Sequence, residues 1–166
     1  NLLDIVSRLN ILTGRPVLPP NWAFGLWISS NEWNSQAKVE EIIYQNESHQ
    51  IPVSVMVLEA WSDENTFYIW NESKYSPQAG NESFQLSDFD FPKSGLWPDP
   101  KGMVEKLHSL GMYVLLWQIP ILKENEENHP QLENDKNFMV EKDYCVRTDK
   151  NEPYLVRPFW FKGGLL

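Results

Sequence analysis

Three runs of apolar residues stand out along the chain. Residues 22–29 (WAFGLWIS) are mostly aromatic and aliphatic and follow Pro20, which predicts a first buried strand. Residues 52–58 are almost continuously apolar, a pattern typical of a strand covered on both faces in a parallel sheet. Residues 112–121 (MYVLLWQIPI) form a third run, which Pro120 brings to an end. We expect these three runs to be strands of one sheet.

Helical patterns separate the three runs. Within residues 35–46 (SQAKVEEIIYQN), apolar residues recur at i, i+3 and i+4 with charged residues on the other side, which predicts an amphipathic helix. Before the third run, Asp99 can cap a helix, Pro100 suits its first position and Gly111 can end it. This alternation of strand and helix predicts an α/β fold with right-handed parallel crossovers, either a (β/α) barrel or an open doubly wound sheet.

The segments outside this pattern are less regular. Residues 1–20 carry Gly14 and three prolines near their end, which favours an extended connector, and we expect residues 21–166 to form a single domain. Residues 62–97 are long, irregular and rich in aromatic residues, so we expect an ordered excursion over the sheet after the second strand.

The last quarter of the chain changes in character twice. Residues 123–152 are rich in Asn, Asp, Glu and Lys, which predicts a surface segment with a short helix over residues 130–137. Residues 153–166 are apolar and end without a polar or capping element. We therefore expect the chain to be cut out of a longer protein.

Composition excludes several classes of partner. The formal charge of −9 and the isoelectric point of about 4.8 leave no basic stripe for nucleic acid. No apolar run approaches the ~20 residues that span a bilayer and no signal segment is visible, which slightly favours a cytoplasmic protein. Cys145 is the only cysteine, so an intrachain disulfide and a cysteine-rich zinc site are excluded.

Common catalytic motifs are missing as well. The three histidines share no ligand spacing, no glycine-rich loop connects a strand to a helix, and no Gly-x-Ser-x-Gly elbow occurs. We therefore expect neither a metal nor a cofactor. The 8 Trp, 6 Tyr and 8 Phe are more informative, because flat rings with polar edges suit the faces of sugars, although packing explains any single ring more simply.

Candidate site residues follow from the parallel topology, because functional groups gather at the carboxyl ends of parallel strands. An acidic or indole side chain stands at the end of each of the three predicted strands: Glu32 and Trp33, Glu59 and Trp61, and Trp117. Taken one by one, each could instead be a loop charge or a packing residue.

With these residues in place, the chain resembles glycoside hydrolase family 31, which contains α-glucosidases, α-xylosidases, sulfoquinovosidases and transglycosylases. The resemblance spans nearly the whole chain through "LTGRPVLPPNWAFGLW", "IPVSVMVLEAW" and "WPDPKGMVEKLHSLGMYVLLWQIP", in that order and separation. It implies the amino-terminal portion of a (β/α)8 TIM barrel, about its first three β/α units, with the aromatic-rich excursion as an insertion after the second strand.

The resemblance also implies roles for single residues. Glu59 stands where the family usually has a substrate-binding Asp, so the longer side chain is a departure from the pattern. Trp117 and Trp160 match indoles that line the sugar pocket in some members, and Trp61 lies in a variable stretch. Glu32 and Trp33 would face the same pocket from the first strand.

The family's nucleophile and acid/base stand on later strands, which the resemblance places beyond Leu166. The chain is thus expected to be a fragment of an α-glycosidase that contributes to the pocket for an α-linked glucoside or oligosaccharide, contains no catalytic residue and is inactive by itself. An α-glucan transglycosylase is the alternative within the family. Outside it stand a non-catalytic carbohydrate-binding or interaction module, and a complete open-sheet enzyme that uses Glu59 with Glu32.

An incomplete barrel leaves a strand edge unpaired, so we also expect self-association of the chain.

Overall fold

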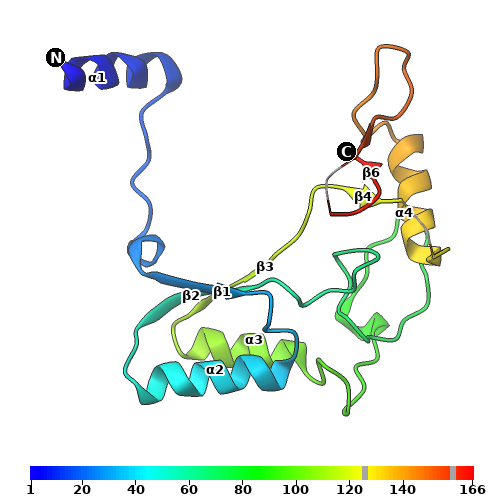
Figure 1. The fold of residues 1–166 in the computed structure, drawn as a ribbon, viewed down its shortest axis with the longest axis horizontal. Coiled ribbons are helices and arrows are strands. Elements are labelled where there is room, and N and C mark those ends of the chain that lie inside the picture. The colour runs from blue at the N-terminus through cyan, green and yellow to red at the C-terminus, as the bar shows by residue number, and fades with distance from the viewer. Residues whose placement is uncertain (125–126, 158–159) are drawn as a thin grey trace.

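A three-stranded parallel sheet forms the centre of the molecule. The computed structural model describes residues 1–124, 127–157 and 160–166. The strands lie in the order β1 (Leu26–Ser30), β2 (Val53–Leu58) and β3 (Tyr113–Leu116). The helices α2 (Gln36–Ser48) and α3 (Pro100–Ser109) cover one face of the sheet (Figure 1). This arrangement confirms the predicted alternation of strands and helices in a parallel α/β fold.

The core lies between β2 and the two helices. β2 is the central strand and four of its six residues are buried, since it has a neighbour on each side and helices over one face. The buried cluster joins residues from β2, α2, α3 and the segments that follow the strands: Val39, Ile43, Val53, Met56, Leu58, Trp61, Trp97, Met103, Leu107 and Met112. Burial of one such aliphatic side chain contributes about 1.5–3 kcal/mol, so this cluster holds the helices on the sheet.

A side chain caps the first turn of α2 and of α3, and the cap at Asp99 was predicted. The Ser35 hydroxyl accepts a hydrogen bond from the Lys38 amide at 3.3 Å at the start of α2. The Asp99 carboxylate accepts from the Gly102 amide at 2.9 Å at the start of α3, with Pro100 in the first turn. Each cap satisfies a backbone N–H that has no partner inside the helix.

The first strand begins later than predicted. Residues Asn21–Phe24 form a 3₁₀ turn, η1, which ends where the Gly25 amide donates to the Trp22 carbonyl at 3.1 Å. Gly25 then passes close to β2, and a β carbon on it would lie 1.8 Å from Ser54 Oγ. A glycine is therefore needed at the point where β1 enters the sheet.

The third strand ends earlier than predicted. β3 stops at Leu116 and not at residue 121, because β2, its partner, ends at Leu58 and Leu58 pairs with Leu116. One further hydrogen bond runs from the Trp117 amide to the Leu58 carbonyl at 2.9 Å. Beyond that point the chain leaves the parallel sheet.

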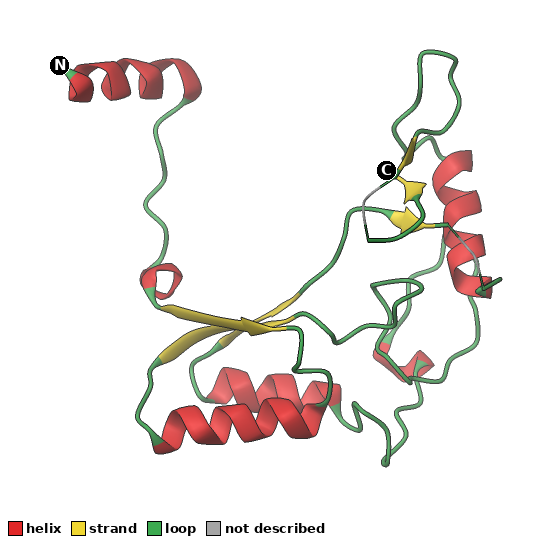
Figure 2. Cartoon of the chain, in the orientation of Figure 1, coloured by secondary structure: helices red, strands yellow, loops and turns green. Residues whose placement is uncertain are grey.

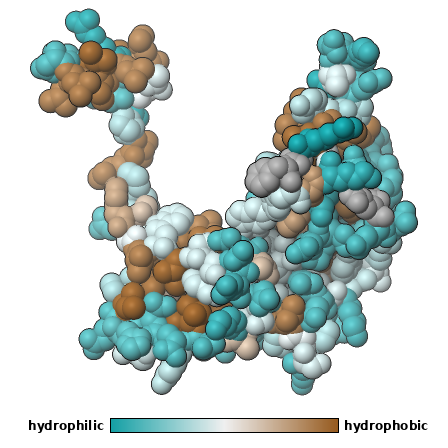
Figure 3. All heavy atoms as spheres, viewed as in Figure 1, coloured by the Kyte–Doolittle hydropathy of each residue, from teal (hydrophilic) through white to brown (hydrophobic). Residues whose placement is uncertain are grey.

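The prediction that residues 1–20 are extended was wrong for their first part. The helix α1 (Leu2–Thr13) begins at Asn1, whose side chain accepts from the Asp4 amide at 3.1 Å. The glycine and prolines that suggested a connector all lie after this helix, and Gly14, with φ of 95°, ends it. None of the residues of α1 is buried, and Figure 3 shows its apolar side chains exposed on an arm away from the sheet. Across the described ranges, no helix has both the length and the apolar character that a membrane crossing requires.

A second group of elements follows the sheet (Figure 2). The helix α4 (Pro130–Glu141) is longer than the predicted helix over residues 130–137. Three two-residue strands, β4 (Leu122–Lys123), β5 (Leu155–Val156) and β6 (Gly164–Leu165), form an antiparallel sheet in the order β4-β6-β5. Such short strands carry no readable alternation, and the sequence did not predict them.

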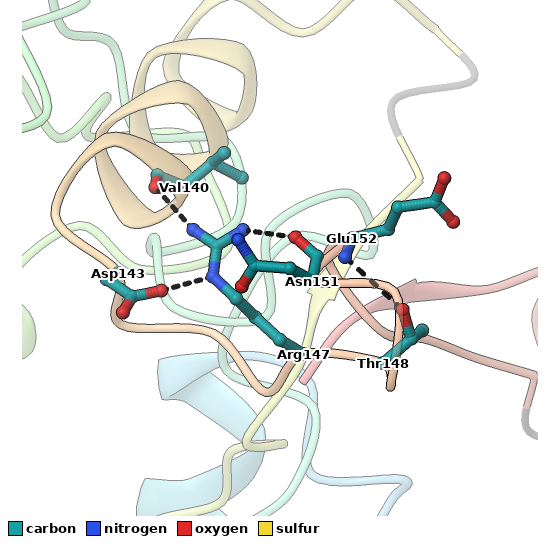
Figure 4. Close-up of polar contacts among 6 residues, drawn as sticks. All are labelled: Val140, Asp143, Arg147, Thr148, Asn151 and Glu152. Atoms are coloured by element: carbon teal, nitrogen blue, oxygen red, sulfur yellow. Dashed lines mark hydrogen bonds and ion pairs between the residues drawn. The ribbon is translucent and has the colours of Figure 1, made fainter.

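The polar loop between α4 and β5 is held by one arginine (Figure 4). The Arg147 guanidinium forms an ion pair with Asp143 and donates to the carbonyl oxygens of Asn151 at 3.0 Å and Val140 at 3.4 Å. Next to it, the Thr148 hydroxyl accepts from the backbone of the same turn. Charged and polar contacts thus order this segment at the surface, where the sequence predicted it.

The segment of residues 62–97 contains the short 3₁₀ helix η2 (Leu86–Asp88) and isolated bridges such as Ser62 with Trp70. It is tied to α4, because the Gln78 amide donates to Gln131 Oε1 and the Asn134 side chain donates to the Gln78 carbonyl, both at 2.7 Å. These hydrogen bonds bring the segment next to the second group of elements.

Candidate functional site

A cavity of about 480 Å³ lies where the three parallel strands end. Residues that follow each strand contribute to its walls, together with one residue from near the end of the described chain. Its lining consists of Asn31, Asn34, Glu59, Ala60, Ser62, Glu64, Phe67, Asn71, Leu96, Trp117 and Trp160. The position at the carboxyl ends of the strands agrees with where parallel α/β folds place their ligands.

Glu59 lies directly after β2 and lines this cavity, half-buried. Its Oε1 accepts a short hydrogen bond from the Ser29 hydroxyl on the neighbouring β1. Among the described residues, none donates a hydrogen bond to Oε2, so this second oxygen can accept one from a ligand. The chain thus holds a carboxylate at the cavity with one oxygen anchored and the other available.

Two of the predicted rings form part of the cavity wall. The ring centroids of Trp117 and Trp160 lie 5.8 Å apart, and Trp160 is 49% exposed. Phe67, which was not among the predicted site residues, completes this aromatic wall, with its ring centroid 5.8 Å from that of Trp117 and 5.7 Å from that of Trp160. Its position in the aromatic-rich segment was the only signal in the sequence.

Trp61 is in the core and not at the cavity. Its side chain is 3% exposed, and its ring packs edge-on against Trp70 with 4.9 Å between centroids. The indole Nε1 donates a hydrogen bond to the Trp117 carbonyl oxygen at 2.7 Å. Trp61 therefore connects the end of β2 to the end of β3 and acts on the cavity only through the backbone of Trp117.

The structure also separates Glu32 and Trp33 from the cavity. Glu32 is exposed, and Trp33 is half-buried and packs against the core cluster. Asn31 and Asn34 line the cavity in their place. Since the chain turns directly after β1, residues one position away from the predicted pair point toward the cavity.

The cavity walls combine one anchored carboxylate, the Glu64 carboxyl group, the amides of Asn31, Asn34 and Asn71, and three aromatic rings. Amide and carboxylate groups exchange hydrogen bonds with hydroxyl groups, whereas the rings pack on apolar C–H faces. A ligand with many hydroxyl groups and flat apolar faces fits this lining. In the part of the chain that the structure describes, no group of three or more His, Cys, Asp or Glu is arranged to hold a metal ion.

Comparisons with known protein families and with single proteins agree on one family. The sequence model for the glycosyl hydrolases family 31 TIM-barrel domain matches residues 16–163. An isomaltosyltransferase from Sporosarcina globispora is 42% identical over 167 residues, which cover 100% of this chain and 15% of that protein.

Two solved structures are similar over 98% of the chain. A cycloalternan-forming enzyme from Listeria monocytogenes, in complex with a pentasaccharide substrate, has a TM-score of 0.90 and 40% identity, with 15% of that chain covered. A cycloalternan-degrading enzyme from Trueperella pyogenes, in complex with a covalent intermediate, has a TM-score of 0.91 and 39% identity, with 22% covered. The chain thus spans less than a quarter of the length of each of these relatives.

Proposed function

Because the chain belongs to glycosyl hydrolase family 31, we propose that it forms part of the sugar pocket of an enzyme that acts on α-linked glucose oligosaccharides. The observation that carries this proposal is the cavity at the strand ends, where the Glu59 carboxylate faces the same space as the rings of Trp117 and Trp160. A carboxylate forms strong hydrogen bonds to sugar hydroxyls, and the rings exclude water and pack on the apolar sugar face.

In this proposal β1, β2 and β3 are the first three strands of an eight-stranded barrel, and residues 62–97 are an insertion after β2. The nucleophile and the acid/base lie on strands outside this chain, so the chain positions the sugar and does not cleave the bond. The segment over residues 157–166 would lead to the nucleophile strand, and its residues 158 and 159 lie outside the described residues.

The first experiment compares this chain with the longer protein of the same gene on a nitrophenyl α-glucoside. We expect turnover only by the longer protein. Turnover by the 166-residue chain itself would contradict the proposal and direct the search for a catalytic pair to Glu59 and Glu64, the two glutamates at the cavity.

The second experiment tests the carboxylate in the longer protein. Glu59→Gln keeps the shape and removes the charge; because a hydrogen bond to a charged group contributes about 1.5–3 kcal/mol, we expect kcat/KM to fall by roughly 10- to 150-fold. Glu32→Gln, on an exposed side chain outside the cavity, is the matched control and should leave kcat/KM unchanged. Equal effects of the two substitutions would refute the assignment of Glu59 to the pocket.

Transfer of the sugar to another sugar is the second candidate reaction, and the 42% identity to an isomaltosyltransferase favours it. The ratio of transfer product to free glucose, measured with an isomalto-oligosaccharide, distinguishes the two reactions. If the product mixture contains no transfer product, hydrolysis is the reaction that remains.

We also propose that the isolated chain self-associates. β1 and β3 are edge strands, and Trp27, Tyr113 and Leu115 on them are 44%, 47% and 42% exposed. Contact between copies would remove this apolar surface from water. Light scattering of the isolated chain should show a dimer or larger species, and a monodisperse monomer would contradict this proposal.

A further inference from the structure

Phe67 occupies an unusual backbone conformation at the cavity. Its φ angle is 61°, in the left-handed region that a bulky side chain rarely adopts. Such strain persists only where the surrounding structure enforces it, and it occurs frequently where a side chain must point in a particular direction. Here the ring points to the wall that Trp117 and Trp160 also form.

A closed loop around Asp63 enforces this conformation. The Asp63 Oδ1 accepts from the amides of Asn65 at 2.8 Å and Thr66 at 2.9 Å, and its carbonyl accepts from the Phe67 amide at 3.0 Å. The buried Thr66 hydroxyl donates to Asp63 Oδ2 at 2.5 Å. Ile69, whose carbonyl accepts from the Asp63 amide at 2.8 Å, closes the loop.

Two side chains connect this loop to the second group of elements. The Tyr68 hydroxyl donates to Asp135 Oδ2 on α4 at 2.5 Å. Burial and the adjacent Asp135 carboxylate raise the pKa of Tyr68, so the hydroxyl keeps the proton that it donates. From β4, the Lys123 ammonium hydrogen-bonds to the Glu64 carbonyl and lies 5.1 Å from the centre of the Phe67 ring. The loop is thus held on both sides of Phe67.

We propose that Phe67 is a specificity-determining residue on which the apolar face of a glucose ring packs, and that Tyr68 and Asp135 are positioning residues that hold this ring in place. This inference rests on the proposed function of the cavity and extends it to the segment after β2. The aromatic face supplies contact area without a hydrogen bond, so Phe67 selects for a flat pyranose surface and not for a particular hydroxyl.

The test uses the longer protein, with isomaltotriose as the probe. We expect Phe67→Leu to raise KM about tenfold with kcat unchanged, because the leucine keeps the apolar volume and loses the flat face. Phe91→Leu, on a ring that contacts Phe89 and does not line the cavity, is the matched control and should leave KM unchanged. An unchanged KM for Phe67→Leu overturns the inference.

A double-mutant cycle tests the positioning role. Tyr68→Phe removes the hydroxyl and should raise KM about threefold in the parent, but should have no effect in the Phe67→Leu background, since it acts through the ring. Asp135→Asn should give the same pattern. Tyr44→Phe, which removes an exposed hydroxyl from α2, is the control. An equal rise of KM with and without the Phe67 ring would show that the hydrogen bond between Tyr68 and Asp135 does not act through that ring, and would overturn the positioning role.

A second readout separates this inference from the proposed function. If the longer protein turns over no α-linked substrate, the proposed reaction fails. The dissociation constant for isomaltotriose, followed through the intrinsic tryptophan fluorescence of the protein, then decides the inference. Weaker binding by Phe67→Leu than by Phe91→Leu supports it, and equal or absent binding overturns it.

Discussion

Replacement of Trp61 by phenylalanine tests the most consequential assignment in the structure. Trp61 stands among the candidate ligand-binding residues by its position after β2, but the structure places it in the core at 3% exposure. Trp61→Phe removes the indole N–H that donates to the Trp117 carbonyl at 2.7 Å, and it reduces the ring that packs against Trp70.

The size of the effect follows from these two losses. Loss of the donor to the Trp117 carbonyl, in a part-buried hydrogen bond, costs about 1–3 kcal/mol. The smaller ring leaves unfilled space; removal of a whole Trp side chain costs about 3–5 kcal/mol, so we assign roughly 1 kcal/mol to this partial truncation. The free energy of unfolding should therefore fall by about 2–4 kcal/mol, which corresponds to a Tm lower by roughly 4–16 °C for a domain of this size.

Urea unfolding followed by circular dichroism measures this difference, and Trp160→Phe provides the matched control. Trp160 is 49% exposed, so its replacement should change stability by less than about 1 kcal/mol while weakening oligosaccharide binding. The reasoning is refuted if Trp61→Phe is no less stable than Trp160→Phe, since the indole hydrogen bond to Trp117 and the packing on Trp70 would then contribute no measurable stability.

Three further predictions concern the strands and the loop beside the cavity. Gly25→Ala should cost about 1–3 kcal/mol, because the new β carbon meets Ser54, and Ser54→Gly should recover part of it in thermal melts; no loss in the single variant would contradict the close approach. Asp63→Ala should lower the unfolding free energy by about 1.5–3 kcal/mol through the lost bonds to Thr66, and an unchanged urea midpoint would count against that role. Burial, with the Asp63 and Asp135 charges, raises the pKa of Tyr75 from 10.0 to about 12. The protonated phenol is thus favoured in the folded state. Its contribution to the free energy of unfolding is fully present below pH 10 and is lost as the pH rises from 10 to 12. Between pH 10 and 12 the urea midpoint should fall less steeply with pH for Tyr75→Phe than for the unsubstituted chain, and identical slopes for the two would refute this linkage.

The sequence by itself determined the elements that depend on local patterns. The apolar periodicity of α2, the Asp99 cap of α3 and the continuous run of β2 each act through neighbours a few residues apart. They therefore located these elements, with their ends shifted by a few residues. Once a strand is located in the sequence, its carboxyl end is located too, so the positions of Glu59 and Trp117 at the cavity could also be predicted.

Only the tertiary structure decided which of the neighbouring side chains reach the cavity. Trp61 became a core residue because Trp70 packs edge-on against it and Trp97, distant along the chain, packs in turn on Trp70, and no local pattern records that. Asn31 takes the place of Glu32 because the turn after β1 sets the direction of each side chain. Phe67 reaches the wall because the local hydrogen bond between Asp63 and Ile69 and the bond across the fold from Tyr68 to Asp135 together impose a backbone conformation that phenylalanine rarely adopts.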